Sequence, residues 1–347
     1  MRSVRSFLAP TLTLTLIILS AASLRAQEAP DVSGPPPRSS AAEQAPELHD
    51  TQTLKVNVNL VNVYFSVRDK SGFLTGLKKD ECTLLEEKEP QTFKQFTQEK
   101  NLPLTIGILL DTSGSQQYVL PLEQDAGARF LKEVLTPKDE AFLISFDINV
   151  DMLADYTNNA GELKRAINKA SINTGATSGS ITGNAPPRGT LLYDAVYLAA
   201  NEKLRAEAGR KVIVMLTDGG DQGSQENLKS AIEAAQKSNA IVYVILIADN
   251  AFGGSFNLGF GSPVADMERL AGDTGGRVIN VGNNGRRLED AFNQIQDELR
   301  TQYLASYTPK NAAADGKYRK IDITCGSGRK VQARKGYYAI AGDSDGQ

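Results

Sequence analysis

The chain has 347 residues, with 38 Lys plus Arg against 41 Asp plus Glu, one His, two Cys and no Trp. Its single imidazole, His49, lies in a Pro-, Ala- and Glu-rich stretch, so Ser-His-Asp triads and histidine-ligated zinc sites have no candidate in a folded region. Cys82 and Cys325 are too far apart in sequence for a Cys-rich zinc site or a CxxC redox pair, and the slightly acidic charge gives no sign of nucleic-acid binding.

The N-terminus has the pattern of a secretory signal peptide. Two arginines precede an apolar run over 7–22, and small residues follow it. We expect 1–26 to be the signal peptide, with cleavage after Ala26, and an exported, periplasmic or extracellular, mature protein. The alternative is a retained membrane anchor, although the run is shorter than the roughly 20 residues that span a bilayer.

A linker and a β-rich flank are expected next. Residues 27–52 are rich in Pro, Ala, Ser and Glu and nearly free of large apolar groups, which predicts a disordered linker. The N-terminal β flank is expected at 53–100. Apolar residues alternate there from Leu54, and the alternation slips by one residue at Val61, which predicts a bulge or bend.

Strands alternate with helices over 103–302, which predicts a doubly wound α/β domain with a mostly parallel sheet. Continuous apolar runs such as TIGILLD are typical of strands buried on both faces. Two strands are close enough in sequence to form one antiparallel hairpin. The expected strands are 105–111, 141–146, 150–156, 211–217, 241–248 and 276–281, and the expected helices are 121–135, 161–170, 191–205, 226–238, 263–271 and 287–302.

A second β-rich flank is expected at 303–341, with DG and GSG turns between short strands. Neither flank has enough strands to form an independent core. We therefore predict that 303–341 pairs with 53–100 into one small β subdomain. The α/β domain would then be inserted between the two flanks.

Oxygen-bearing side chains are placed at the carboxyl ends of the expected parallel strands, where open α/β folds bind ligands. One strand ends in a DxSxS sequence, another ends in TDG, and a GT pair precedes the helix 191–205. Three loops thus deliver two carboxylates and three hydroxyls to one sheet edge. These hard oxygens suit an octahedral ion, so we predict a Mg²⁺ or Mn²⁺ site with the ligands Asp111, Ser113, Ser115, Thr190 and Asp218.

Each of these motifs is weak when it is read singly. Serines in DxSxS commonly cap a helix, and Thr190 has the same alternative role. Asp111 is expected as an exposed charge at the edge, so that its replacement would leave the fold intact. Nearby Asp194 and Asp221 either orient the ligands or cap helices and face solvent.

At these residues the chain resembles the von Willebrand factor A domain, whose metal ion-dependent adhesion site (MIDAS) is written DxSxS, then Thr, then Asp. The flanks, with VRDKSGFLTGL, DGKYRKIDI and ARKGYYA, are similar to an exported acidobacterial family of von Willebrand factor A-related domains. Lys88 departs from that family, which more often has glycine in this turn. The resemblance implies a Rossmann-like fold and a binding module in which a partner protein's Asp or Glu completes the shell of the ion.

Two other classes of function remain open. A phosphatase of the haloacid dehalogenase type needs a second Asp where Ser113 stands, and a metal-dependent hydrolase needs a base that shows no distinctive spacing. A structural scaffold that binds no metal is the other alternative. We expect an adhesion or assembly module that is not an enzyme, binds no nucleic acid, and contacts a membrane only through a retained signal peptide.

Two further predictions concern the surroundings of the site and the β subdomain. Loops at 171–189 and 249–262 are long and lack secondary-structure patterns, which is common in functional loops. Phe252, Phe256 and Phe260 in the second loop would form an aromatic rim for partner contact, or would pin the loop to its own domain. Cys82 and Cys325 both alternate with buried residues, so they form a disulfide between the flanks or stay as buried thiols.

Overall fold

The structure is a computed structural model that describes residues 60–99, 102–173, 189–247 and 262–340. The predicted signal peptide and linker, most of the two long loops, and Phe252, Phe256 and Phe260 lie outside these ranges. The described residues all belong to one compact unit, Val56–Gln347. Within them, every helix is too short or too polar to span a bilayer.

A six-stranded sheet forms the centre of the α/β domain, with strand order β11-β10-β9-β6-β7-β8. All neighbours are parallel except β7 and β8, which form the expected antiparallel hairpin. Every residue of β6, β9 and β10 is buried, which explains their continuous apolar sequences. The strands are β6 (Leu104–Asp111), β7 (Glu140–Phe146), β8 (Val150–Thr157), β9 (Arg210–Thr217), β10 (Ala240–Leu246) and β11 (Val278–Asn280).

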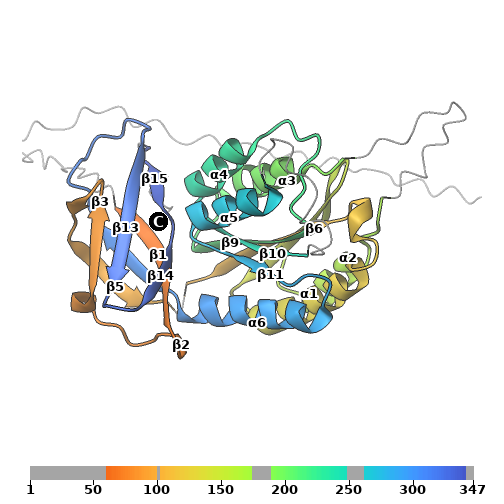
Figure 1. Ribbon diagram of the computed structural model, residues 1–347, viewed down its shortest axis with the longest axis horizontal. Coiled ribbons are helices and arrows are strands. Elements are labelled where there is room, and N and C mark those ends of the chain that lie inside the picture. Colours follow the sequence, from red (N-terminus) through yellow and green to blue (C-terminus); the bar gives the residue numbers. More distant parts are fainter. Residues whose placement is uncertain (1–59, 100–101, 174–188, 248–261, 341–347) are drawn as a thin grey trace, which may run out of the picture. The chain divides into compact units, whose positions relative to one another are not determined.

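Helices cover both faces of this sheet (Figure 1). One face packs against α1 (Leu120–Val134), α2 (Ala160–Ile167) and α6 (Gly285–Thr301). The other packs against α3 (Leu192–Leu198), α4 (Leu228–Lys237) and α5 (Pro263–Thr274). The helix expected at 191–205 is in two parts, because α3 passes into the π-helical turn η3 (Ala199–Leu204). A 3₁₀ turn, η2 (Gly114–Gln116), precedes α1.

The two flanks pair into antiparallel sheets around a shared core, which confirms the predicted fold class. One sheet has the order β14-β1-β12-β5 with β2 beside β1, and the other has the order β15-β13-β3-β4. The N-terminal flank supplies β1 (Val61–Asp69), β2 (Gly72–Phe73), η1 (Lys79–Glu81), β3 (Cys82–Glu86), β4 (Glu89–Pro90) and β5 (Phe93–Gln98). The C-terminal flank supplies β12 (Tyr303–Tyr307), β13 (Tyr318–Cys325), β14 (Lys330–Ala333) and β15 (Gly336–Tyr338).

The alternation that begins at Val61 forms β1. Its apolar members face the core of the β subdomain: Val61, Val63, Phe65 and Val67 are all buried. Leu60, the residue before the strand, is 45% exposed. The earlier alternation from Leu54 to Val58 lies outside the described residues.

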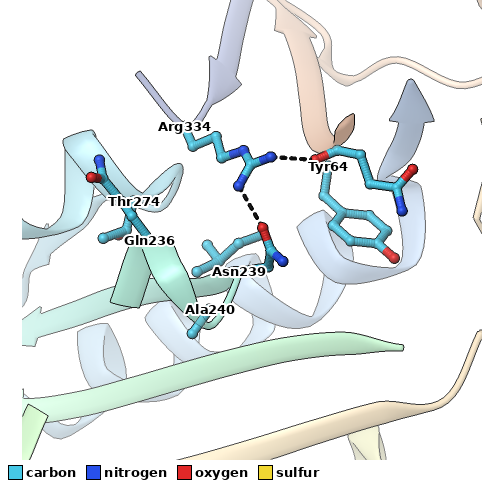
Figure 2. Close-up of a pocket in the computed structure, with 8 residues that line it drawn as sticks. Tyr64, Gln236, Asn239, Ala240, Thr274 and Arg334 are labelled. Atoms are coloured by element: carbon cyan, nitrogen blue, oxygen red, sulfur yellow. Dashed lines mark hydrogen bonds between the residues drawn. The ribbon is translucent and has the colours of Figure 1, made fainter. Parts of the chain in front are cut away.

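Polar side chains join the β strands to the α/β domain. Arg334, which follows β14, donates from Nη1 to Oδ1 of Asn239 at 2.5 Å and from Nη2 to the carbonyl of Asn62 at 2.6 Å (Figure 2). It lines a small pocket together with Tyr64 and Gln236. These partly buried hydrogen bonds connect the subdomain formed by the flanks to the end of α4.

Candidate metal centre

The register of two central strands places two acidic loops side by side. Leu110 of β6 is aligned with Leu216 of β9, so Asp111 and Thr217 end neighbouring parallel strands. The hydroxyl of Thr217 donates to Oδ2 of Asp111 at 2.6 Å. The chain leaves β6 towards α1 on one face and leaves β9 towards α4 on the other. Such a reversal at the carboxyl ends of parallel strands forms the crevice in which α/β folds bind ligands.

The DxSxS loop curls so that its two serine hydroxyls face each other. The backbone N–H of Ser113 donates to Oδ1 of Asp111 at 3.0 Å, and Oγ of Ser113 lies 3.0 Å from Oγ of Ser115. Thr112 points away and donates its hydroxyl to Asp147 at 2.8 Å. Neither η2 nor α1 has a side-chain cap. The serines therefore do not have the alternative role of helix caps.

The loop that carries Thr190 is joined to the loop that carries Asp218. Thr190 and Gln222 exchange two backbone hydrogen bonds of 2.9 Å each. The contact is close at Gly189, where a Cβ atom would lie 2.8 Å from the carbonyl oxygen of Gln222. Only glycine allows this approach without a shift of the backbone. Thr190 does not cap α3, whose N-cap is Leu191.

Asp194 and Asp221 connect the same two loops. Asp194, in α3, accepts hydrogen bonds from the backbone N–H groups of Gln225 and Glu226 at 3.1 and 2.7 Å. Asp221 accepts from the N–H of Tyr193 at 3.2 Å and from the hydroxyl of Ser224 at 2.6 Å. Both aspartates thus hold the loops around the site in place, and neither is a simple solvated charge.

Asp111 is buried, so the prediction that it is an exposed charge at the edge is wrong. Its exposed fraction is 0%, because the loops after β6, β7 and β9 close over the end of the strand. Burial raises the pKa of Asp111 to about 6, although hydrogen bonds from Ser113 and Thr217 oppose this shift, and the charge of Asp218 raises it further. Asp218 is partly exposed and accepts from the N–H of Gly220 at 3.2 Å.

Sequence reasoning missed two buried polar residues beside this loop. Gln116 is 1% exposed and Glu123 is 0% exposed. Burial, followed by the charges of Asp111 and Asp218, raises the pKa of Glu123 well above its usual range. The signal was available for Glu123, because it falls among the apolar residues that α1 buries, whereas Gln116 belongs to the 3₁₀ turn η2 and gave no such signal.

The donor set fits a hard divalent cation. Asp111, Ser113, Ser115 and Asp218 lie at one sheet edge, and the Thr190 segment is attached to the loop after Asp218. Carboxylate and hydroxyl oxygens are ligands that Mg²⁺ and Mn²⁺ accept. Among the described residues, no three or more His, Cys, Asp or Glu are grouped to hold a metal. An ion at this edge would therefore depend on the hydroxyls as much as on the aspartates.

The two cysteines meet in the β subdomain. Cys82 of β3 and Cys325 of β13 are direct partners in the antiparallel register, with Cα atoms 4.0 Å apart. Their Sγ atoms are bonded in the structure, at 2.08 Å. The bond joins residues of the two flanks that are separated by 243 positions in sequence.

Comparisons with known proteins place this chain in a family. It is similar to the protein BatB from Bacteroides thetaiotaomicron (17% identity, TM-score 0.42, 56% of this chain and 98% of that chain). It is also similar to the vWF domain of the type V pili tip protein Mfa5 from Porphyromonas gingivalis (14%, 0.43, 57% and 95%). A third similar structure is proximal thread matrix protein 1 from the mussel byssus with a zinc-occupied MIDAS motif (14%, 0.46, 62% and 50%).

No curated protein matches the sequence. The sequence profile of the von Willebrand factor type A domain matches residues 105–294, which is more than half of the chain and spans β6 to α6. The chain therefore belongs to the von Willebrand factor type A domain family, whose domains are protein-interaction modules.

Proposed function

We propose that this protein binds a partner protein through a divalent metal ion, Mg²⁺ or Mn²⁺. The observation that supports this most directly is the buried Asp111, which is hydrogen-bonded at the switch point of the sheet beside the paired hydroxyls of the DxSxS loop. The residues that would hold the ion are Asp111, Ser113, Ser115, Thr190 and Asp218.

The chemistry of this set favours an acidic group of the partner. Two carboxylates balance the charge of a divalent ion, so the ion keeps an affinity for one more anionic oxygen. An exposed Asp or Glu of another protein supplies that oxygen. Ser113 stands where a phosphatase of the haloacid dehalogenase type needs a second Asp, and the only imidazole is outside the described residues. The role proposed is therefore adhesion or assembly, without catalysis.

Export is part of the proposal. The arginines and the apolar run before Ala26 are those of a signal peptide, and a disulfide persists in the periplasm or outside the cell. The proposed mature chain begins after Ala26. It consists of the linker 27–52, the flanks 53–100 and 303–341, and the von Willebrand factor A domain over 103–302.

Titration calorimetry with Mg²⁺ tests the metal site. Asp111→Asn keeps the size of the side chain and removes a ligand charge, so we expect it to weaken Mg²⁺ binding by at least about 100-fold. Asp151→Asn, the same change at an exposed residue of β8, should bind as the wild type does. Equal affinity of the wild type and Asp111→Asn for Mg²⁺ would show that the site is wrongly assigned.

A carboxylate-bearing peptide on a solid support tests the partner chemistry. We expect the protein to be retained in Mg²⁺ and eluted by EDTA, whereas a peptide with amides in place of the carboxylates should retain nothing. Retention that EDTA does not change would favour the structural scaffold. Turnover of a phosphate ester in Mg²⁺ would favour an enzyme.

A further inference from the structure

Two fully buried polar side chains lie next to the candidate metal centre without a hydrogen-bond partner. Both oxygens of the Glu123 carboxyl group, and both polar atoms of the Gln116 amide, make no hydrogen bond within the described part of the chain. A buried polar group without a partner destabilises the folded state. Natural proteins keep few of them, and each one calls for a physical reason.

A chain of backbone hydrogen bonds ties these side chains to the DxSxS loop. The N–H of Gln116 donates to the carbonyl of Ser113 at 3.0 Å, and the N–H of Val119 donates to the carbonyl of Gln116 at 3.0 Å. The N–H of Glu123 then donates to the carbonyl of Val119 at 3.1 Å. Gln116, at the end of η2, and Glu123, in the first turn of α1, therefore both follow the DxSxS loop closely along the chain.

Glu123 lies close enough to the two proposed ligand aspartates for their charges to act on it. The charges that act on Glu123 are those of Asp111 and Asp218, and both are acidic. Glu123 is hydrogen-bonded to neither of them. Two buried carboxyl groups, those of Asp111 and Glu123, and the partly exposed Asp218 therefore act on one another at the carboxyl edge of the sheet. A cation would balance the charge of these acidic groups. Water molecules bound to the cation would donate hydrogen bonds to the carboxylate of Glu123.

We propose that Glu123 and Gln116 form the inner wall of the metal centre, where they accept hydrogen bonds from water molecules bound to the ion. This inference rests on the proposed function. Glu123 is a positioning residue and not a ligand, and a cation beside it would favour its charged form, which accepts hydrogen bonds from bound water. Keeping it buried lowers the stability of the metal-free protein, so stability and metal affinity are opposed at this residue.

The replacement Glu123→Gln separates this role from a purely structural one, because it keeps the size and removes the charge. We expect Mg²⁺ affinity, measured by calorimetry, to fall by about 10- to 100-fold. The melting temperature in EDTA should change little, because the amide is as buried and as unpartnered as the carboxyl group that it replaces. Glu133→Gln, the same change at an exposed position of α1, should alter neither quantity.

The outcomes distinguish the two proposals. If Glu123→Gln binds Mg²⁺ as tightly as the wild type, while Asp111→Asn does not bind it, this inference is overturned and the metal site stands. If the wild type binds no Mg²⁺, both are overturned. If Glu123→Gln does not fold, Gln116→Leu is the second variant. It should weaken Mg²⁺ binding, and it should raise the melting temperature in EDTA because it removes a buried unpartnered amide. Unchanged binding in Gln116→Leu would likewise overturn the inference.

Discussion

The carboxyl group of Asp111, like that of Glu123, is buried beside the candidate metal centre. Asp111 is desolvated at the end of β6, yet it accepts hydrogen bonds from Ser113 and Thr217, which favour its charged form. The sequence predicts the identity of this residue and its place at a strand end. It does not predict the burial, because burial depends on how the loops after three different strands close over the residue.

The titration of Asp111 predicts how stability depends on pH in metal-free protein. Its pKa is raised from 3.8 to about 6 in the folded state, so the folded protein binds this proton more tightly than the unfolded chain does. The stability that Asp111 contributes is therefore complete below about pH 4 and is lost as the pH rises through about 6. Relative to Asp111→Asn, the wild type should lose about 3 kcal/mol of unfolding free energy over that range.

Urea denaturation of the two proteins in EDTA, at several pH values between about 4 and 7, measures this difference. Both proteins share every other titrating group, so the difference between them reports Asp111 together with the groups on which its charge acts, such as Glu123. A difference in unfolding free energy that stays constant across the pH range would contradict the raised pKa of Asp111.

Gly189 sets the distance between two loops of the site. In Gly189→Ala the new Cβ would meet the carbonyl of Gln222 at 2.8 Å, so the segments that carry Thr190 and Asp218 must move apart. We expect a loss of about 1–3 kcal/mol in stability and about a 10-fold weaker affinity for Mg²⁺. Gly272→Ala, in α5, is the matched control away from the proposed ligands, since a Cβ there meets nothing within 4 Å. Equal Mg²⁺ affinity in the two variants, by calorimetry, would rule out this role for Gly189.

At the scale of elements, hydrophobic periodicity predicted the regular structure well and missed local departures. The helix expected at 121–135 is α1, Leu120–Val134, because an apolar face repeats along it and Pro121 favours the first turn. The helix expected at 191–205 changes to π-helical geometry after α3. The π-helical turn η3 is short, so the spacing of apolar residues along 191–205 does not distinguish it from a continuous α-helix.

The turn between β3 and β4 shows strain at the position where the related family more often has glycine. Glu87 and Lys88 have φ angles of 48° and 71°, the left-handed region that glycine adopts more easily. Lys88→Gly should therefore stabilise the protein by about 1 kcal/mol. Lys94→Gly, in the extended strand β5, should destabilise it, because glycine weakens a strand. Urea denaturation measures the unfolding free energy of both variants, which should rise in Lys88→Gly and fall in Lys94→Gly. A loss of stability in Lys88→Gly would show that the turn is not strained at Lys88.

At the scale of the whole molecule, chain order predicted which loops approach one another at the sheet edge, and no single motif did so. Strand ends on one sheet edge predicted that the DxSxS, Thr and Asp loops approach one another, and the hydrogen bonds between Thr190 and Gln222 are in accord with this. Glu123 was not predicted, because it lies on the buried side of a helix whose pattern was interpreted as core. Residues 174–188 and 248–261 lie outside the described residues, so the aromatic rim of Phe252, Phe256 and Phe260 stays a prediction.

The disulfide affects the whole molecule, because the loop that it closes contains most of the folded chain. Cys82 and Cys325 are partners in adjacent strands on either side of the inserted domain. Restricting so long a loop in the unfolded state contributes up to roughly 5 kcal/mol in the chain-entropy model. The double variant Cys82→Ala with Cys325→Ala should therefore melt at a lower temperature. It should keep the wild-type Mg²⁺ affinity, since the cysteines lie in the core of the β subdomain and the proposed ligands do not.

Thiol titration of denatured, unreduced protein decides whether the bond is present in solution. We expect no reactive thiol, together with a monomer on a non-reducing gel. Two reactive thiols per chain would exclude the bond. Loss of Mg²⁺ binding in a folded double variant would instead show that the flanks hold the metal site in place, because the β subdomain reaches the α/β domain through Arg334 and through the hydrogen bond from Ser66 to Glu298, 2.8 Å long.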